Sequence, residues 1–385
     1  MKRFPFIRRA VVLAILSLVC IRLHAPVRAE ALLSIGSKAP SLNISDWIQQ
    51  GEGKYPEVTS FEAGNVYVVE FWATWCGPCI QSMPHLAKLQ EEYADRKVQI
   101  ISVSDESVEE VKEFLKRQAG NKEGEPITFE KLTSVYCLTT DPDGSTQLTY
   151  TRAAKINGIP CAFIVGKDGK IEWIGHPMEM DEPLLQVVED RWNRDEFAQQ
   201  YNEEKGLESL KEDLAELLQN SGESDPSAKN IDAAFGMIDE FQKKLKTPSI
   251  VKQTRFLKFD LLIQFRSEAP EAIEVGREVF KDFSARPIEL HSLTWGIYEF
   301  ANAGQIKNPQ LVVEALKATE AVLPRVPPQQ RGTVLDTIAH LQYKVGDIES
   351  ALKSAREAAE APDATADIGI FVSQLEAELK KKQGK

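Results

Sequence analysis

Residues 70–80 read EFWATWCGPCI, in which Cys76 and Cys79 are separated by a Gly-Pro pair. The stretch continues the apolar run at 66–72, VYVVEFW, whose β-branched and aromatic residues predict a strand buried on both faces. From Cys79 onward a helical stripe follows, formed by Met83, Leu86, Leu89 and Tyr93. A strand that leads directly into a helix places Cys76 at the N-terminus of that helix.

A Cys-x-x-Cys pair can be a redox dithiol, half of a zinc site or a structural disulfide. Zinc needs four ligands, and the sequence holds no second Cys-x-x-Cys and no Cys/His pair at zinc-finger spacing. A permanent disulfide across so small a loop stabilises little. At a helix N-terminus, unpaired N–H groups and the helix dipole stabilise a thiolate. The position therefore favours a redox dithiol, in which Cys76 attacks a substrate disulfide and Cys79 resolves the mixed disulfide.

The residues after the dithiol alternate between strand and helix patterns. Further strands are predicted at 98–105, 135–141, 161–166 and 170–175, and helices at 108–118 and 145–155. The last two strands are joined by Lys167-Asp168-Gly169, an Asp-Gly turn typical of a β-hairpin. Strands that alternate with helices and close on a hairpin predict an α/β domain with a mixed sheet.

The character of the chain changes after about residue 195. Strand patterns end, Glu, Lys, Ala, Leu and Gln dominate, and QNSGESDPS at 219–227 indicates a break between helices. Within 333–359, small residues resemble the spacing of one tetratricopeptide helix pair, at Ala339, Gly346, Ala351 and Ala358. We therefore predict an all-α domain of helical hairpins, with a tetratricopeptide-like unit as one form that it can take.

The chain begins with a pattern typical of a secretory leader. Basic residues precede a short apolar run at 10–21, and Val27-x-Ala29 predicts cleavage after Ala29. The run is shorter than the ~20 residues that cross a bilayer, although an uncleaved anchor is the alternative. We expect export to the periplasm or another extracytoplasmic compartment, where disulfides persist. Cleavage takes the formal net charge from −12 to −18, which argues against nucleic acid or an anionic membrane as partner.

Three separated motifs together resemble one known family. WATWCGPC at 72–79, GIPCAFIVGKDGKIEWIGHP at 158–177 and the opening GSKAP at 36–40 are similar to the thioredoxin superfamily, most of all to its exported TlpA/ResA-type thiol–disulfide oxidoreductases. The resemblance covers residues 33–192. It implies a thioredoxin fold, with a mixed sheet flanked by helices, an activity without a bound cofactor or metal, and a membrane thiol-transfer protein as electron donor. We therefore expect a signal peptide at 1–29, a thioredoxin-like domain at 30–195 and a helical domain at 196–385.

The resemblance also implies roles for individual residues. Cys76 matches the nucleophile and Cys79 the resolving thiol, with a Gly-Pro dipeptide of the reducing type between them. Pro160 matches the cis-proline opposite the dithiol, which leaves the backbone of Ile159 free to pair with a bound substrate. We expect Trp75 to take part in substrate binding with these two residues.

Glu70 matches the buried carboxylate of thioredoxins, which accepts the proton that Cys79 loses. A solvated edge residue is the alternative, and its apolar neighbours in the run 66–72 argue against it. Pro84 matches the proline that kinks the active-site helix. One departure from the family is Ser82, at a position where many exported relatives carry a glutamate.

Two more cysteines need an explanation. Cys161 stands where the family usually has Thr or Ala, and we expect a small buried side chain there, with a third redox thiol as the alternative. Cys137 lies in a predicted strand and is most simply a core residue. A bridge between the two is conceivable in an oxidising compartment, but spacing alone cannot supply its geometry.

These observations predict an exported thiol–disulfide oxidoreductase that reduces protein disulfides through Cys76 and Cys79. The alternative function is a protein-binding adaptor, in which the helical half binds a protein ligand and the first domain is a scaffold. Intact Cys76, Cys79 and Pro160 argue against that alternative. A thiol peroxidase is disfavoured because the Pro-x-x-x-Thr-x-x-Cys loop is missing and residue 73 is Ala.

Overall fold

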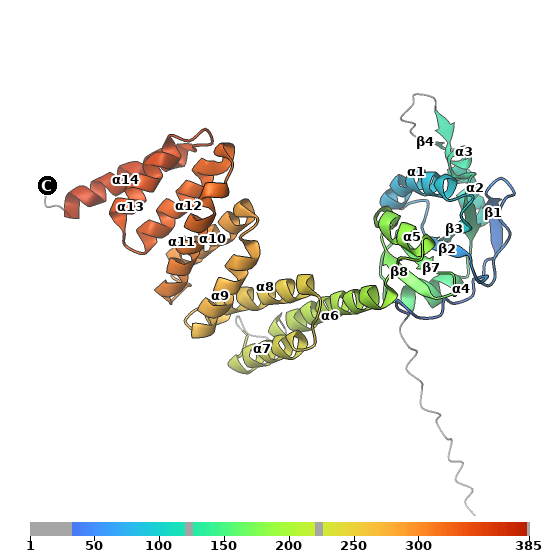
Figure 1. Ribbon diagram of the computed structural model, residues 1–385, viewed down its shortest axis with the longest axis horizontal. Helices are drawn as coiled ribbons and strands as arrows, with labels where there is room; N and C mark the ends of the chain where they lie inside the picture. Colours follow the sequence, from blue (N-terminus) through green and yellow to red (C-terminus); the bar gives the residue numbers. More distant parts are fainter. Residues whose placement is uncertain (1–32, 120–125, 220–225, 383–385) are drawn as a thin grey trace, which may run out of the picture. The chain divides into compact units, whose positions relative to one another are not determined.

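The computed structural model describes residues 33–119, 126–219 and 226–382. The chain divides between Arg194 and Asp195 into two compact units. The first contains a sheet with its flanking helices, and the second contains the remaining helices (Figure 1). The predicted signal peptide, 1–29, lies outside the described residues.

The first unit is built on a six-stranded mixed sheet, which confirms the predicted fold class. In spatial order its strands are β1 (Asp46–Gln50), β6 (Cys137–Thr140), β3 (Val98–Ser104), β2 (Val66–Phe71), β7 (Cys161–Val165) and β8 (Ile171–Gly175). β3 pairs parallel with both β2 and β6, whereas the other three pairings are antiparallel. All six residues of β2 are buried, as its near-continuous apolar run predicts.

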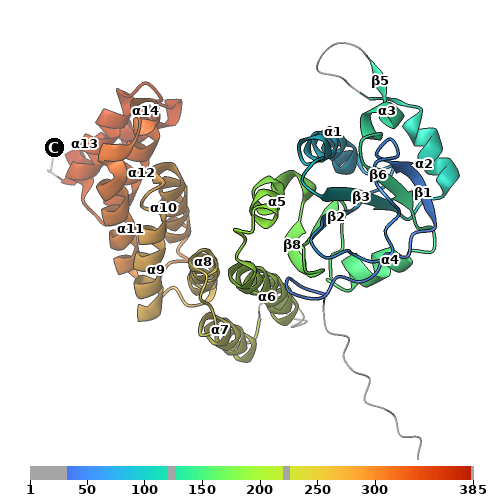
Figure 2. The same ribbon diagram turned by 45° about the vertical axis from the view of Figure 1, so that its right-hand side comes forward.

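Alternation along β2 defines two faces of the sheet. Val66, Val68 and Trp72 belong to one core, which α1 (Gly77–Glu92), α2 (Val108–Leu115), α3 (Phe129–Thr133) and α5 (Asp181–Val188) complete. On the other face, Phe71 packs against Phe163 and against Tyr150. Tyr150 lies in the π-helical turn η1 (Leu148–Arg152), which directly follows α4 (Ser145–Gln147) on that side of the sheet (Figure 2).

Two predicted helices differ from the structure at their ends. The helix predicted at 108–118 stops at Leu115, because Gln118–Ala119 forms β4 and pairs with β5 (Ile127–Thr128). The helix predicted at 145–155 is the short α4 followed by η1 and ends at Arg152. The predicted hairpin of β7 and β8 is present, and Gly169 in its turn has a φ of +73° that favours glycine.

The second unit is helical throughout its described residues. Its helices are α6 (Arg194–Gln219), α7 (Ala228–Gln242), α8 (Pro248–Phe265), α9 (Pro270–Phe283), α10 (Pro287–Asn302), α11 (Pro309–Val322), α12 (Arg331–Lys344), α13 (Ile348–Ala359) and α14 (Ala366–Lys382), with short 3₁₀ turns η3 (Leu323–Arg325) and η4 (Pro328–Gln330). Helices α8 to α11 each begin with proline, which suits the first helical position because no N–H partner is needed there.

The helix pair α12 and α13 occupies the stretch with the small-residue spacing. Ala339, Ala351 and Ala358 are buried between packed helices, and Gly346 lies in the connecting turn with a φ of +92°. The hairpin is therefore present, while its membership of the tetratricopeptide class stays a prediction. Among the described residues, no helix combines the length and apolar character needed to cross a membrane.

Candidate active site

Cys76 and Cys79 form a disulfide at the start of α1. Cys76 is the N-cap residue of the helix, and its Sγ accepts a hydrogen bond from the backbone N–H of Cys79 at 3.2 Å. The two Cα atoms are 5.3 Å apart, and the side chains are 4 % and 1 % exposed. The same N–H that contacts Cys76 in the disulfide is positioned to stabilise a thiolate on that sulfur.

A loop before β7 lies against the dithiol. The peptide bond between Ile159 and Pro160 is cis, and the carbonyl oxygen of Ile159 is 3.7 Å from Cys76 Sγ. Beside them, Trp75 is 74 % exposed and lines a cavity of about 540 Å³ together with Ile159 and Arg152. The cavity is thus lined by Trp75, the residue before Cys76, and by Ile159, whose carbonyl oxygen is near Cys76 Sγ.

The turn before Cys76 is held by a carboxylate that sequence reasoning missed. Glu106 accepts hydrogen bonds from the backbone N–H of Thr74 at 2.7 Å and from its hydroxyl at 2.6 Å. The hydroxyl of Ser104 donates to the same carboxylate at 3.0 Å. Glu106 follows β3, which is parallel to β2, so both strands end at the same edge of the sheet. In the sequence, the signal that could have pointed to Glu106 is its position directly after the strand predicted at 98–105.

Glu70 lies at the centre of the sheet and is 1 % exposed, not a solvated edge residue. It pairs with Ser102 of β3 and with Ala162 of β7. It shares a face with Val68, and thus the core that also contains Cys79. Burial raises the pKa of Glu70 from its ordinary value of 4.5 to about 8, against a smaller lowering by the Ser102 hydroxyl.

Ser82 and Pro84 are two further positions of α1 that the family resemblance singled out. Ser82 is buried, and its hydroxyl donates to the carbonyl oxygen of Cys79 at 2.7 Å, so it supports the helix rather than supplying an acid. Pro84 lies inside the helix, as the resemblance implies.

Cys137 and Cys161 are buried cysteines outside the disulfide. Their strands, β6 and β7, are separated in the sheet by β3 and β2. Three strand spacings amount to roughly 14 Å, and a disulfide needs Cα atoms within about 7 Å. The geometry therefore excludes the conceivable bridge between them.

The strand register also places Cys161 relative to the dithiol. Cys161 pairs with Phe71, so its side chain points to the Phe71 face of the sheet. Ala162 and Glu70 point to the opposite face, on which α1 packs. Burial raises the pKa of the Cys137 thiol to about 12, against a smaller lowering by the hydrogen bond from Gln99.

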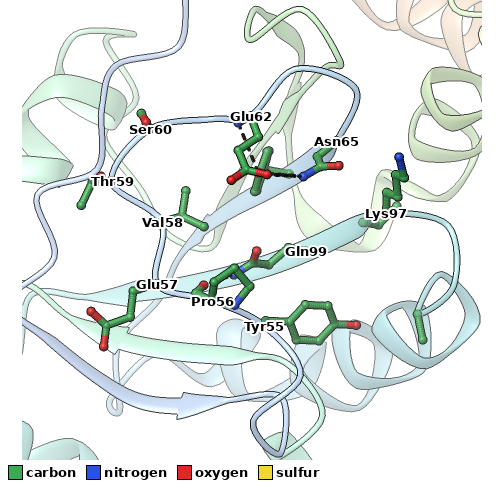
Figure 3. A pocket seen from close by; sticks show the side chains of 13 residues that line it. Tyr55, Pro56, Glu57, Val58, Thr59, Ser60, Glu62, Asn65, Lys97 and Gln99 are labelled. Carbon is green, nitrogen blue, oxygen red and sulfur yellow. Dashed lines mark hydrogen bonds between the residues drawn. The ribbon is translucent and has the colours of Figure 1, made fainter.

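Another pocket lies at the opposite end of β2 and β3. Its cavity of about 310 Å³ is lined by Asn65 and Tyr67 at the start of β2 and by Lys97 and Gln99 at the start of β3 (Figure 3). Asn65 donates a hydrogen bond to Glu62 at 3.3 Å in this pocket. The lining contains no cysteine, and in the described part of the chain no cluster of His, Cys, Asp and Glu is arranged to hold a metal ion.

Comparison with known proteins finds similar sequences among thiol-disulfide oxidoreductases. The family model described as the AhpC/TSA family matches residues 35–174. The thiol-disulfide oxidoreductase ResA of Bacillus thuringiensis (strain Al Hakam) is 30 % identical over 174 residues, 44 % of this chain and 87 % of that protein. Protein FixW of Rhizobium leguminosarum is 24 % identical over 208 residues, 54 % of this chain and 90 % of that protein.

Among solved structures, the chain is similar to the thioredoxin domain of a thiol-disulfide oxidoreductase from Bacteroides vulgatus. The identity is 23 %, with 42 % of this chain and 99 % of that chain covered, and at a TM-score of 0.29 this likeness adds no weight to the sequence matches. The ResA match defines the class: the chain belongs to the thioredoxin superfamily, among the ResA-type thiol–disulfide oxidoreductases.

Proposed function

We propose that the protein is an exported enzyme that reduces disulfides of substrate proteins through Cys76 and Cys79. The observation that carries the proposal is the position of Cys76 Sγ, at the N-cap of α1 and 3.7 Å from the Ile159 carbonyl oxygen. The sulfur thus combines a site that stabilises a thiolate with a neighbouring backbone that can align a substrate chain.

In the first step, the thiolate of Cys76 attacks one sulfur of the substrate disulfide. The new bond joins Cys76 to that sulfur, the substrate S–S bond breaks, and the other substrate sulfur leaves as a thiolate. The Cys79 N–H, which contacts Cys76 Sγ at 3.2 Å, stabilises the attacking anion. We expect the substrate to bind in the cavity that Trp75 and Ile159 line.

In the second step, Cys79 loses its proton to the carboxylate of Glu70 and attacks Cys76 Sγ. The Cys76–Cys79 disulfide forms, and the second substrate sulfur leaves, so two electrons have passed to the substrate. Because the pKa of Glu70 is raised to about 8, its basic form increases with pH through that value. Resolution of the mixed disulfide is therefore expected to accelerate between about pH 7 and pH 9.

The proposal includes location and partners. The leader pattern at 1–29 supports export, and each turnover requires a dithiol donor that returns two electrons to the disulfide. We propose a membrane thiol-transfer protein as that donor and a protein ligand for the helical unit. The charge of −18 after leader removal supports protein partners over nucleic acid.

Disulfide reduction by the full chain, measured with insulin and a dithiol donor, tests the proposal. Cys76→Ser is expected to abolish turnover. Cys161→Ala is the matched control, expected to cost about 1 kcal/mol of stability and to leave turnover unchanged, because this thiol points to the other face of the sheet. Substantial turnover by Cys76→Ser would refute the assignment.

A further inference from the structure

A basic cavity of about 290 Å³ lies in the helical unit, where α9, α10 and α11 meet. Four exposed cations line it, namely Arg277 and Lys281 of α9, Lys317 of α11 and Arg325 of the turn η3 that follows α11. The unit as a whole has the opposite charge, because Asp and Glu outnumber Lys and Arg in 195–385. The cations therefore create a local positive potential on an acidic unit. We call these four side chains the rim.

The buried part of the cavity lining is apolar. Phe280, Leu290 and Val322 line it, and each is at most 3 % exposed. They come from α9, α10 and α11, whose buried residues form one core, and the three helices lie side by side in both views (Figures 1 and 2). The cavity thus combines an apolar interior with a cationic rim.

One carboxylate of the chain already contacts the rim. A single oxygen of Glu314 lies 3.0 Å from Nη2 of Arg277 and 3.2 Å from Nζ of Lys317. The hydrogen bond from Arg277, followed by those from Gln310 and Lys317, lowers the pKa of Glu314 to about 2, against the opposing effect of burial. The surroundings of the cavity therefore favour a carboxylate over its protonated form.

Glu314 does not use the full binding capacity of the rim. Of the rim cations, Arg277 and Lys317 form ion pairs at this cavity, and within the described chain neither Lys281 nor Arg325 takes part in one. Arg277 has five N–H donors and Lys317 has three, so both keep donors after the contact with Glu314. One carboxylate among four cations leaves a positive surplus, which a second acidic group can neutralise.

We propose that this cavity docks an extended acidic segment of a partner protein. Its carboxylates contact the rim, and an apolar side chain enters the buried part of the cavity. Successive side chains of an extended chain point to opposite sides, so a segment in which acidic and apolar residues alternate presents both kinds at once. The proposal deepens the proposed function and rests on the part of it that gives the helical unit a protein ligand.

The spacing of the rim fits such a segment. Arg277 and Lys281 are four residues apart and therefore lie on the same face of α9. Four residues of a helix span about 6 Å along its axis. Alternate side chains of an extended chain are separated by roughly 6.6 Å, so neighbouring carboxylates of the segment can contact both cations.

The positions of the rim cations also have a structural consequence. Lys281 lies in the last turn of α9, and Arg325 follows α11 directly. Cations near the C-terminus of a helix stabilise it through the helix dipole. A lower melting temperature would follow from loss of that effect alone, so the deciding measurement has to be ligand binding.

The test measures binding of a fluorescein-labelled peptide, Ser-Glu-Val-Glu-Val-Glu-Ser, to the full chain by fluorescence anisotropy. The matched peptide carries Gln in place of every Glu. Lys281→Gln combined with Arg325→Gln removes the two unpaired rim cations. The control combines Lys307→Gln with Lys353→Gln, which takes two exposed lysines from the same unit but outside the cavity. Circular dichroism establishes that each variant is folded.

We expect saturable binding of the Glu peptide that weakens with added salt, and binding of the Gln peptide that is at least about tenfold weaker. The double rim variant should bind the Glu peptide about tenfold more weakly, since one exposed ion pair contributes a factor of up to about five. Glu314→Gln should bind it about threefold more tightly, because Arg277 and Lys317 are then released for the ligand. The control variant should stay within about twofold of the wild type.

The proposal is overturned if the two peptides bind equally, if no saturable binding occurs up to about 1 mM peptide, or if Glu314→Gln binds the Glu peptide more weakly. Equal weakening in the rim and control variants would also overturn it, because the attraction would then be unspecific. Glu-peptide binding that survives in the rim variant places the ligand elsewhere on the unit, which overturns this site and leaves the proposed protein ligand standing. Insulin reduction by the full chain tests the dithiol of the first unit separately, so failure of the proposed reductase gives a different result.

Discussion

A carboxyl group at the centre of a sheet has opposite consequences for stability and for chemistry. Glu70 gains a pKa of about 8 from burial, which brings it into the range useful for accepting a thiol proton. The same burial makes its ionised form unfavourable in the folded chain. The folded protein therefore holds the Glu70 proton more tightly than the unfolded chain, whose carboxyl has the ordinary value of 4.5.

This difference predicts a loss of stability with rising pH. The contribution of protonated Glu70 is fully present below about pH 4.5 and disappears as the pH rises through about 8. The wild-type protein should lose on the order of 4 kcal/mol relative to Glu70→Gln between about pH 5 and pH 9. Urea unfolding of both oxidised proteins at the two pH values measures the difference. A gap that does not change with pH would show that Glu70 titrates normally.

At the scale of elements, the predictable parts of the fold are those whose sequence is dictated by burial. β2, β3 and β7 are buried over their full length, and their largely apolar, β-branched sequences predicted them. The edge strand β1 was missed, because its sequence DWIQQ is polar and only partly buried. Its place in the sheet comes from pairing with β6, a long-range contact that local pattern does not carry.

The residues of the candidate site also fall into those that the sequence predicts and those that it does not. Cys76, Cys79 and Pro160 lie in short motifs, which made them predictable from sequence. Glu106 comes from a later segment of the chain, and the strand order brings it to the turn before Cys76. It does not lie in a recognisable motif, so the structure was needed to find it.

Glu106 joins two elements, the turn before α1 and the end of β3. Its carboxylate accepts three hydrogen bonds from Thr74 and Ser104, and an amide in its place can accept at one of its two terminal atoms only. We expect Glu106→Gln to lower the free energy of unfolding by about 1–2 kcal/mol and to slow the first attack on substrate. Urea unfolding and insulin reduction measure both effects. The exposed Glu109→Gln is the control, and equal behaviour of the two variants would remove Glu106 from the site.

At the scale of the whole molecule, the division between Arg194 and Asp195 suggests that the first unit stands alone. Arg194 itself belongs to that unit, since its guanidinium pairs with Asp168 at 2.7 Å and also contacts Glu172. A chain ending at residue 195 keeps these contacts. We therefore expect deletion of 196–385 to leave a cooperatively folded protein with insulin reductase activity near that of the full chain. Loss of the cooperative unfolding transition would mean that both units share one folding core.

The central claim is that Cys76 attacks and Cys79 resolves, and trapping the mixed disulfide tests it most directly. Full-length Cys79→Ser lacks the thiol for the second step, so it should accumulate substrate bound through a disulfide. Mass mapping after proteolysis locates the bond. The account predicts that the substrate is attached to Cys76 and that Cys76→Ser traps none. Attachment to Cys161 or Cys137, or substrate release by Cys79→Ser at the wild-type rate, would contradict it.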